Sequence, residues 1–344
     1  MSVQSKTIFG FRSSAVPATA ALLFLSALFL LPFLWMVSTS LKPLDQTMTV
    51  PPTWLPRAFY IEEQGRTIRV RFDEKNSRIP EEERPGGYYR VREWRQVDDF
   101  SSLPEVFEVK RDRIREIVKF EWGNYRQVFR KIPFLVYLRN TLILAVLGVL
   151  GVLFSNTLVA YGFSKILWRG RDKFFYATMA TMMIPFPVTM IPLFVVFKKL
   201  GMTGTLMPLW VPAFFGSAFN IFLLRQFFRS IPNHLIEAAK IDGCSEFGIF
   251  WRIVLPLSRP ILTVVALFHF MYVWNDFMGP LIYLTNQSDF TLSLGIQFFQ
   301  SQHGGTEWHY LMAASTLMIL PLVVLFFFTQ KTFIESIKLT GGKG

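Results

Sequence analysis

The most ordered set of residues that could support chemistry begins at Glu237. Glu237-Ala-Ala239 is followed by Gly243, and nine residues later comes Ile253-Val-Leu-Pro256. Both parts lie in a polar segment, 228–260, between two apolar runs. A simple connection between packed elements needs only a few residues. The segment is therefore predicted to contact a partner outside the membrane.

Polar side chains also occur inside otherwise apolar stretches. Asn220 lies in one stretch, and Trp274, Asn275 and Asp276 lie in another. Ionisable groups in membrane segments are costly and usually face a bundle interior or a wet cavity. The four residues are candidates for a solvent-lined translocation path. The favoured alternatives are helix–helix hydrogen bonding for Asn220 and anchoring at the membrane interface for Trp274.

The sequence contains no constellation typical of an enzyme or a metal site. The single cysteine, Cys244, excludes an internal disulfide and a multi-cysteine metal site. The four histidines show no ligand spacing, and no Gly-x4-Gly-Lys-Ser/Thr phosphate loop is present. We predict no catalytic residue, no metal and no bound cofactor, so any ATP hydrolysis must reside in another chain.

Long apolar runs must position these residues. The chain has 344 residues, of which 51% are hydrophobic and 37 are Phe. A hydrocarbon core of about 30 Å takes about 20 helical residues, and the alternation of transmembrane β-strands is absent from the runs. The sequence predicts an all-α polytopic membrane protein with six helices, at 15–38, 135–163, 174–198, 205–227, 261–284 and 309–330.

Two of the predicted helices need comment. The run at 15–38 is too long for the apolar core of a signal peptide, so a retained helix is favoured. The helix at 174–198 contains Pro185, Pro187 and Pro192, and proline inside a helix produces a kink. Kinks together with buried polar groups favour a solvent-lined path through the bundle.

The charge of +12 is distributed asymmetrically, which argues against nucleic acid as a partner. Lys and Arg concentrate in the short connections that follow every second helix and in the tail 331–344, whereas 285–308 has none. By the positive-inside rule, the N-terminal 1–14, the loop 228–260 and the tail are cytoplasmic. The region 39–134 is then extracytoplasmic, and the core helices occupy 135–330.

The extracytoplasmic region has strand-like patterns of its own. Segments 66–72 and 88–94 alternate apolar and charged residues, and 81–87 has turn chemistry. A small β-containing subdomain is expected there. The alternative is a partly ordered, charged loop.

The loop 228–260 is predicted to form two short helices that meet at Gly243. Asn233 could cap the first helix and Ser245 the second, which would end before Pro256. Ala238 and Ala239 would offer a flat surface to another backbone, while Gly243 accepts a positive φ. The alternative is an amphipathic helix resting on lipid headgroups.

The spacing in this loop resembles the cytoplasmic signature of ABC importer permeases, the EAA motif. The matching residues are Glu237, Ala238, Ala239, Gly243, Ile253, Leu255 and Pro256, and Asp242 and Pro260 extend the likeness to the carbohydrate branch. Further segments resemble maltose-type permeases of the MalG kind, at 32–43, 124–125, 140–141, 160–161, 274–277, 330–335 and 341–344. The resemblance covers about 15–56 and 120–344, and 57–119 looks like an insertion.

The resemblance implies a type I importer permease fold in the inner membrane and sugar uptake by alternating access. It implies a second permease subunit as a heterodimer partner, two cytoplasmic ABC ATPases that bind ATP, and an extracytoplasmic solute-binding protein. Glu237 would pair with a basic group of the ATPase. The alternative from another class is an ion- or proton-coupled transporter that uses Asp276. That alternative leaves 228–260 unused, and no inverted repeat supports it.

Overall fold

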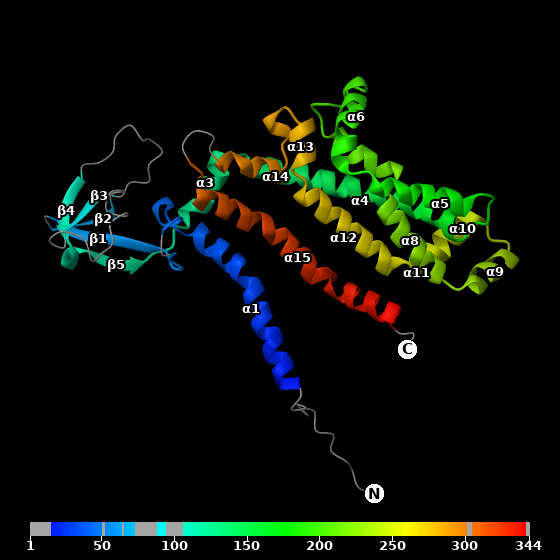
Figure 1. Cartoon of the computed structure of the whole chain (residues 1–344), viewed down its shortest axis with the longest axis horizontal. Helices are drawn as coiled ribbons and strands as arrows, with labels where there is room; N and C mark the ends of the chain where they lie inside the picture. Colours follow the sequence, from blue (N-terminus) through cyan, green and yellow to red (C-terminus); the bar gives the residue numbers. More distant parts are fainter. Residues whose placement is uncertain are drawn as a thin grey trace, which may run out of the picture. The chain divides into compact units, whose positions relative to one another are not determined.

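The computed structural model describes residues 15–49, 52–63, 65–72, 88–93, 106–300 and 305–341 (Figure 1). It divides into two compact units, Met1–Gln127 with Phe299–Thr316, and Val128–Phe298 with Leu317–Gly344. The predictions for 1–14, for the turn at 81–87 and for the last three residues of the tail lie outside the described residues.

Unit 1 begins with α1 (Ala15–Ser40), where the sequence predicts a helix at 15–38. The 18-residue apolar window of this helix has a mean hydropathy of 2.4, and none of it is buried within the chain. Such a surface is stable only in lipid or against another membrane protein. A one-turn 3-10 helix follows at Leu44–Gln46.

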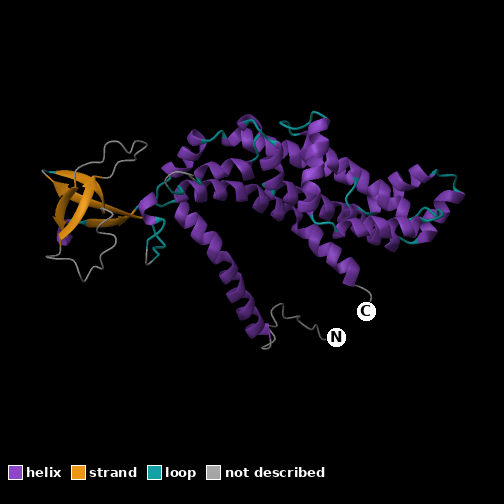
Figure 2. Ribbon diagram, turned by 45° about the horizontal axis from the view of Figure 1, so that its top comes forward, coloured by secondary structure: helices purple, strands orange, loops and turns teal. Residues whose placement is uncertain are grey.

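Unit 1 also contains a five-stranded antiparallel sheet (Figure 2). Its strands, in the spatial order β4-β3-β2-β1-β5, are β1 (Arg57–Glu63), β2 (Arg66–Phe72), β3 (Tyr88–Glu93), β4 (Val106–Lys110) and β5 (Arg115–Val118). Ile61, Val70 and Val91 form the core on one face, as the alternating pattern requires. The predicted β-containing subdomain is confirmed.

The chain that leaves the sheet is tied to the end of α1. The Asn124 side chain donates to the carbonyls of Ser40 and Lys42 at 2.8 and 2.9 Å. The backbone N–H of Glu121 donates to the carbonyl of Leu41 at 2.9 Å. These bonds satisfy carbonyls that the helix leaves free at its C-terminus, and they hold the strand exit beside it.

Unit 2 is helical, with α4 (Phe134–Ser164) as its central element. Before it lies α3 (Gly123–Lys131), which crosses the boundary between the units. The remaining helices of this unit are α5 (Arg171–Ala180), α6 (Phe186–Lys199), α7 (Met207–Trp210), α8 (Ala218–Ser230), α9 (Asn233–Ile241), α10 (Glu246–Ile249), α11 (Leu255–Leu257), α12 (Arg259–Asn275), α13 (Met278–Tyr283) and α14 (Leu292–Gly295). The last helix, α15 (Trp308–Gly341), begins in unit 1 and continues into unit 2.

Within the described residues, four helices are long and apolar enough to cross a membrane, or up to six if each of two bent pairs is one span. One pair, Arg171–Met183 and Phe186–Lys199, bends by 99°. The bend falls at Pro185, whose ring disfavours helical backbone at Ile184, and Ile184 is extended. The proline signal in 174–198 therefore produces a break sharper than the predicted kink.

The predicted helix 261–284 is also interrupted. The helix α12 ends at Asn275, and Asp276 is extended. The Asp276 carboxylate accepts the backbone N–H of Gly279 at 3.0 Å, which begins the separate α13. An Asp side chain that bonds a nearby backbone N–H favours a turn over a continuing helix.

A buried arginine fixes α8 to its neighbours. The Arg225 Nε donates to the carbonyl of Phe163 at 3.1 Å, and its Nη2 donates to Asp172 Oδ1 at 3.0 Å. The guanidinium lies 3.8 Å from the centre of the Phe175 ring. These two hydrogen bonds and the ring contact compensate the burial of the guanidinium. The ends of α4, α5 and α8 are joined at this point.

Candidate functional site

The first helix of the 228–260 loop has one buried and one exposed face. Ile236 and Ala239 belong to a buried core cluster that also contains residues of α4, α8 and α12. Glu237 and Ala238 are exposed. The prediction that both alanines share one outward surface is therefore wrong, because adjacent helix positions point about 100° apart. Ala238 alone is available to a partner, and Ala239 anchors the helix.

The start of α9 is held by a lysine rather than by a cap. The helix begins at Asn233 itself, so the predicted capping role of Asn233 is wrong. Its Oδ1 accepts from Lys165 Nζ at 2.9 Å, and the same ammonium donates to the carbonyl of Ile231 at 2.7 Å. Lys165 follows the last residue of α4, and its burial lowers its pKa. The loop is thereby tied to the end of α4.

Gly243 forms the bend, as predicted. It has a φ of 79°, a value that glycine adopts at no steric cost. The N–H of Gly243 donates to the carbonyl of Lys240 at 3.1 Å, and the N–H of Cys244 donates to that of Ala239 at 2.9 Å. This pair of bonds is a Schellman motif, which closes the C-terminus of α9.

The second helix begins as predicted, because Ser245 Oγ accepts from the N–H of Gly248 at 3.2 Å. It does not end before Pro256. A π-helical turn at Phe250–Val254 leads directly into α11, which contains Pro256. The wider turn separates the proline ring from the preceding carbonyls that an α-helix would place against it. Ile253 and Leu255 pack on the core cluster, and Pro256 is exposed.

Glu246 links the two helices of the loop to the bundle. Its Oε1 lies 2.5 Å from Lys240 Nζ on α9, and its Oε2 accepts from the Tyr161 hydroxyl on α4 at 2.7 Å. The Lys240 ammonium, followed by the Tyr161 hydroxyl, holds the pKa of this carboxyl below its usual value. Sequence reasoning missed this residue, because Tyr161 lies 85 positions away.

We predict that Glu246→Gln loosens the loop without unfolding the bundle. The variant loses its charge attraction to Lys240, and an ion pair as exposed as this one contributes about 0.2–1 kcal/mol. Limited trypsin digestion at Lys240 should become severalfold faster. The folded state lowers the pKa of Glu246, so this contribution is present above the unfolded value of about 4.3 and is lost as pH falls through the folded pKa. Glu237→Gln is the control, and equal digestion of both variants would contradict the prediction.

A cavity of about 640 Å³ lies within unit 2. It is bordered by α4, α6, α7, α8, α12 and α13, and its polar lining residues are Ser217, Asn220, His269, Tyr272, Asp276, Tyr283 and Thr291. Two of the four predicted path residues, Asn220 and Asp276, therefore line one cavity. The volume falls in the range of about 300–1,000 Å³ found for small-molecule sites.

The other two predicted path residues do not line this cavity. Trp274 is completely buried, donates from Nε1 to the carbonyl of Met318 at 3.2 Å and stacks on Phe270. It is a core residue, so the hypothesis of an interface anchor is wrong. Asn275 is exposed and bonds the carbonyl of Met271 in its own helix at 2.8 Å.

The cavity depends on an irregular backbone between Val211–Phe215 and α8. Gly216 has a φ of 93° there, and the chain briefly leaves the helix. Two α4 residues bond the freed groups. Ser155 Oγ donates to the carbonyl of Ala213 at 2.9 Å, and Asn156 Oδ1 accepts from the N–H of Ser217 at 2.6 Å. In a membrane such groups must find partners inside the protein. Sequence reasoning did not single out this pair.

We predict that Asn156→Ala lowers the stability of the subunit strongly. The part-buried Ser217 N–H then loses its acceptor, and an unpaired group costs up to about 1–3 kcal/mol when it is buried. Asn275→Ala is the matched control. Each asparagine donates to the carbonyl four residues earlier in its own helix, but Asn156 also accepts a bond from outside that helix. Thermal unfolding in detergent should show a clear decrease for Asn156→Ala alone, and similar decreases for both would contradict the assignment.

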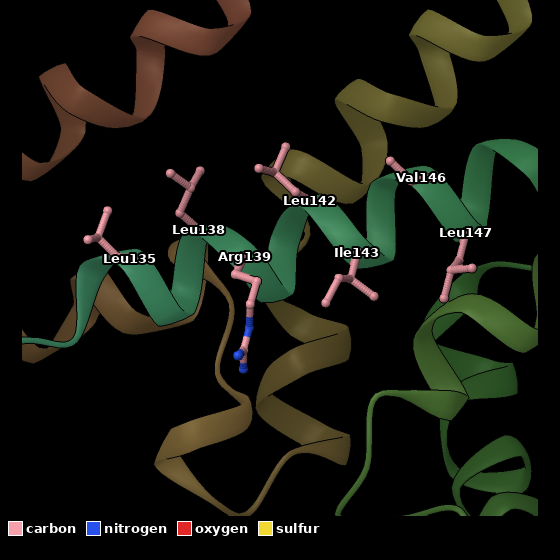
Figure 3. Close-up of a pocket in the computed structure, with 7 residues that line it drawn as sticks. All are labelled: Leu135, Leu138, Arg139, Leu142, Ile143, Val146 and Leu147. Atoms are coloured by element: carbon pink, nitrogen blue, oxygen red, sulfur yellow. The ribbon is translucent and has the colours of Figure 1, made fainter.

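A second groove, of about 500 Å³, runs along the first half of α4 (Figure 3). Its lining consists of six aliphatic side chains and Arg139. A sugar site needs several convergent polar groups, so this groove is a poor candidate for solute contact.

Comparison with known proteins places these features in a family. Residues 157–338 match the family described as "Binding-protein-dependent transport system inner membrane component". The arabinooligosaccharides transport system permease protein AraQ of Bacillus subtilis (strain 168) is 34% identical over 209 residues, which are 60% of this chain and 72% of that protein. The polygalacturonan/rhamnogalacturonan transport system permease protein YtcP of the same organism is 32% identical over 259 residues, 71% of this chain and 89% of that protein.

Two further likenesses support the same family and fold. The probable starch degradation products transport system permease protein AmyC of Thermoanaerobacterium thermosulfurigenes is 32% identical over 214 residues, 62% of this chain and 78% of that protein. The crystal structure of a bacterial ABC transporter involved in the import of the acidic polysaccharide alginate matches with a TM-score of 0.64 at 20% identity. The match covers 94% of this chain and 99% of that chain. The predicted fold class is confirmed.

Proposed function

Because the chain belongs to the family of binding-protein-dependent inner membrane components, the permeases of ABC importers, we propose that it imports an oligosaccharide or a related sugar. The protein is a multi-pass inner membrane subunit, and the hydrolysis of ATP belongs to a partner ATPase. The solute class is supported by the relatives, whose names include arabinooligosaccharides, starch degradation products and rhamnogalacturonan. A MalG-like subunit would form a heterodimer with a second permease.

The observation that carries the proposal is the construction of the 228–260 loop. Ile236 and Ala239 pack α9 on the core, and Glu246 of α10 bonds the loop to Tyr161. Glu237 and Ala238 of α9 are exposed. A docking element needs this combination of a rigid base and a free surface. We assign ATPase coupling to Glu237, Ala238, Ala239, Asp242, Gly243, Ile253, Leu255 and Pro256. Two copies of the ATPase would serve the heterodimer.

The loop is bonded directly to the membrane helices, so a movement of the loop would move them. Lys165 and Glu246 join the loop to α4, and Arg225 joins α8 to the ends of α4 and α5. Closure of the ATPases would therefore move these helices as one body. Alternating access by such rigid-body motion is a common form of switching.

We propose that the loop and both termini are cytoplasmic and that 39–134 faces an extracytoplasmic solute-binding protein. The support is the excess of Lys and Arg in the short connections on one side. Within the membrane, Asn220 and Asp276 would contribute polar contacts from the cavity to a sugar that passes between the two permeases. Aromatic neighbours such as Tyr272 suit the apolar face of a sugar ring.

Reconstitution tests the proposal. The permease pair, the ATPase and the binding protein in proteoliposomes should import sugars from a panel of mono- and oligosaccharides only when ATP is supplied inside. Asp276→Asn should reduce this uptake partially, since asparagine can still accept the Gly279 N–H. Uptake that follows a proton gradient without ATP, and that Asp276→Asn abolishes, would overturn the importer in favour of proton-coupled transport.

A further inference from the structure

Unit 1 carries an exposed apolar patch where the sheet meets the end of α1. We call it the basal patch, and its members are Trp54, Leu55, Val118, Phe120 and Trp122. Trp122 is 67% exposed and Trp54 is 50% exposed. Trp54 and Leu55 lie in the segment that leads into β1, and Val118, Phe120 and Trp122 lie at the end of β5 and beyond it. Arg57 of β1 pairs with Val118 of β5, so the two segments are neighbours. Large exposed apolar patches mark interaction surfaces.

Contacts with α1 place the basal patch at the membrane boundary. The Trp54 ring lies edge-on to Trp35, with 5.2 Å between the ring centres, and the carbonyl of Trp54 accepts from Ser38 Oγ. The N–H of Glu121, between Phe120 and Trp122, donates to the carbonyl of Leu41. All three contacts fall in the last turns of α1 or just beyond them.

The length of α1 sets the depth of these contacts. The helix has 26 residues, so it spans about 39 Å at about 1.5 Å per residue. The hydrocarbon core is only about 30 Å thick. The charged Lys42 follows shortly after α1, so we place the excess at the C-terminal end of the helix. Trp35 then lies in the headgroup region, and the basal patch contacts α1 at this end.

The composition of the basal patch suits this depth. Tryptophan is enriched at membrane interfaces because its ring is apolar and its N–H is polar. The basic residues beside the patch have partners, with Arg57 bonded to Glu116 at 2.6 Å and Lys119 to the Tyr60 hydroxyl at 3.1 Å. Apolar burial rather than attraction to anionic lipid would therefore dominate the binding.

We propose that the basal patch inserts into the headgroup region of the bilayer, so that the sheet is seated on lipid and the depth of α1 is fixed. A water-soluble partner is disfavoured as the occupant, because the patch is held beside the end of α1, at the level of the membrane surface. With the orientation proposed above, these headgroups belong to the outer leaflet. Only this choice of leaflet rests on the proposed function.

The single cysteine makes a labelling experiment direct. Three variants are made in a Cys244→Ser background, each with one new cysteine: Val118→Cys, Trp122→Cys and Thr67→Cys. Each cysteine is labelled with an environment-sensitive fluorophore. Thr67 on β2 is also exposed and serves as the control. The assembled importer is reconstituted with lipids that carry a nitroxide either at the headgroup or deep in the acyl chain. Headgroup nitroxide should quench both patch labels severalfold more than the Thr67 label, and deep nitroxide should quench them less.

The outcomes separate the alternatives. Quenching at Val118 and Trp122 no stronger than at Thr67 would overturn the proposal, whether the labels are hydrated or are shielded by a protein partner. The Val118 variant keeps both tryptophans, so a failure of Trp122→Cys alone to assemble does not decide the result. A membrane-impermeant reductant added outside the liposomes destroys the fluorescence of labels on that side only. The loss or survival of the Thr67 signal therefore gives the side on which the sheet lies. An inside location would refute the proposed orientation while patch quenching still supported lipid contact.

Discussion

Gly243→Val should abolish ATP-driven uptake while the protein still inserts into the membrane. Gly243 has a φ of 79°, and a Cβ added there would meet no atom within 4 Å. The penalty is therefore backbone strain alone. An L-residue in this region costs about 1–2 kcal/mol, and a β-branched residue costs more. A cost of about 1.4 kcal/mol shifts an equilibrium tenfold, so the bend should open at least tenfold more often.

An opened bend would separate the parts of the docking element. The Schellman bonds from Gly243 and Cys244 and the Lys240–Glu246 pair across the bend would be lost. Uptake should then decrease in the order Asn, Ala, Val at position 243, because asparagine tolerates positive φ better than alanine does. Uptake assays and the amount of protein in the membrane fraction measure the two effects separately.

Gly201 provides the matched control for this series. It lies between α6 and α7 with a φ of 68° and with no atom within 4 Å of an added Cβ. Gly201→Val therefore introduces a similar strain away from the 228–260 loop, and uptake should persist. Equal loss of uptake in both variants, or failure of Gly243→Val to insert, would point to a general folding defect rather than to coupling.

Local signals in the sequence predicted much of this structure. The apolar runs marked the membrane helices, and alternation at 66–72 marked β2 of the sheet. Gly243 and Ser245 occupy the bend and the cap that their residue types favour. In each case the physical cause acts within a few residues. Spacing alone is then sufficient to predict the local structure.

The errors arise where a distant residue decides the outcome. Asn233 would cap a helix in isolation, but Lys165 binds its side chain instead. Trp274 has the composition of an interface residue, yet it is buried and donates to the carbonyl of Met318. The bond between Asn156 and Ser217 joins residues 61 positions apart. Such pairings depend on how the helices pack, which local patterns in one sequence do not encode.

Glu237→Ala should weaken ATPase association without destabilising the permease itself. The Glu237 side chain points away from Ile236 and Ala239, which hold α9 on the core. Its truncation removes no packing from the subunit. If Glu237 pairs with a basic group in a closed interface, the loss costs about 2–5 kcal/mol, which is roughly thirtyfold or more in affinity. Copurification of the ATPase and ATP-driven uptake should both decrease.

Glu246→Ala is the contrasting variant. It leaves the Tyr161 hydroxyl and Lys240 without their shared carboxylate, so it should lower the thermal stability of the permease and ATPase binding together. Glu237→Ala should lower only the second. Equal losses of stability in both variants would mean that Glu237 supports the fold, and unchanged ATPase copurification with unchanged uptake would remove Glu237 from the docking surface. The two acidic residues thus separate contact with the ATPase from support of the loop that makes the contact.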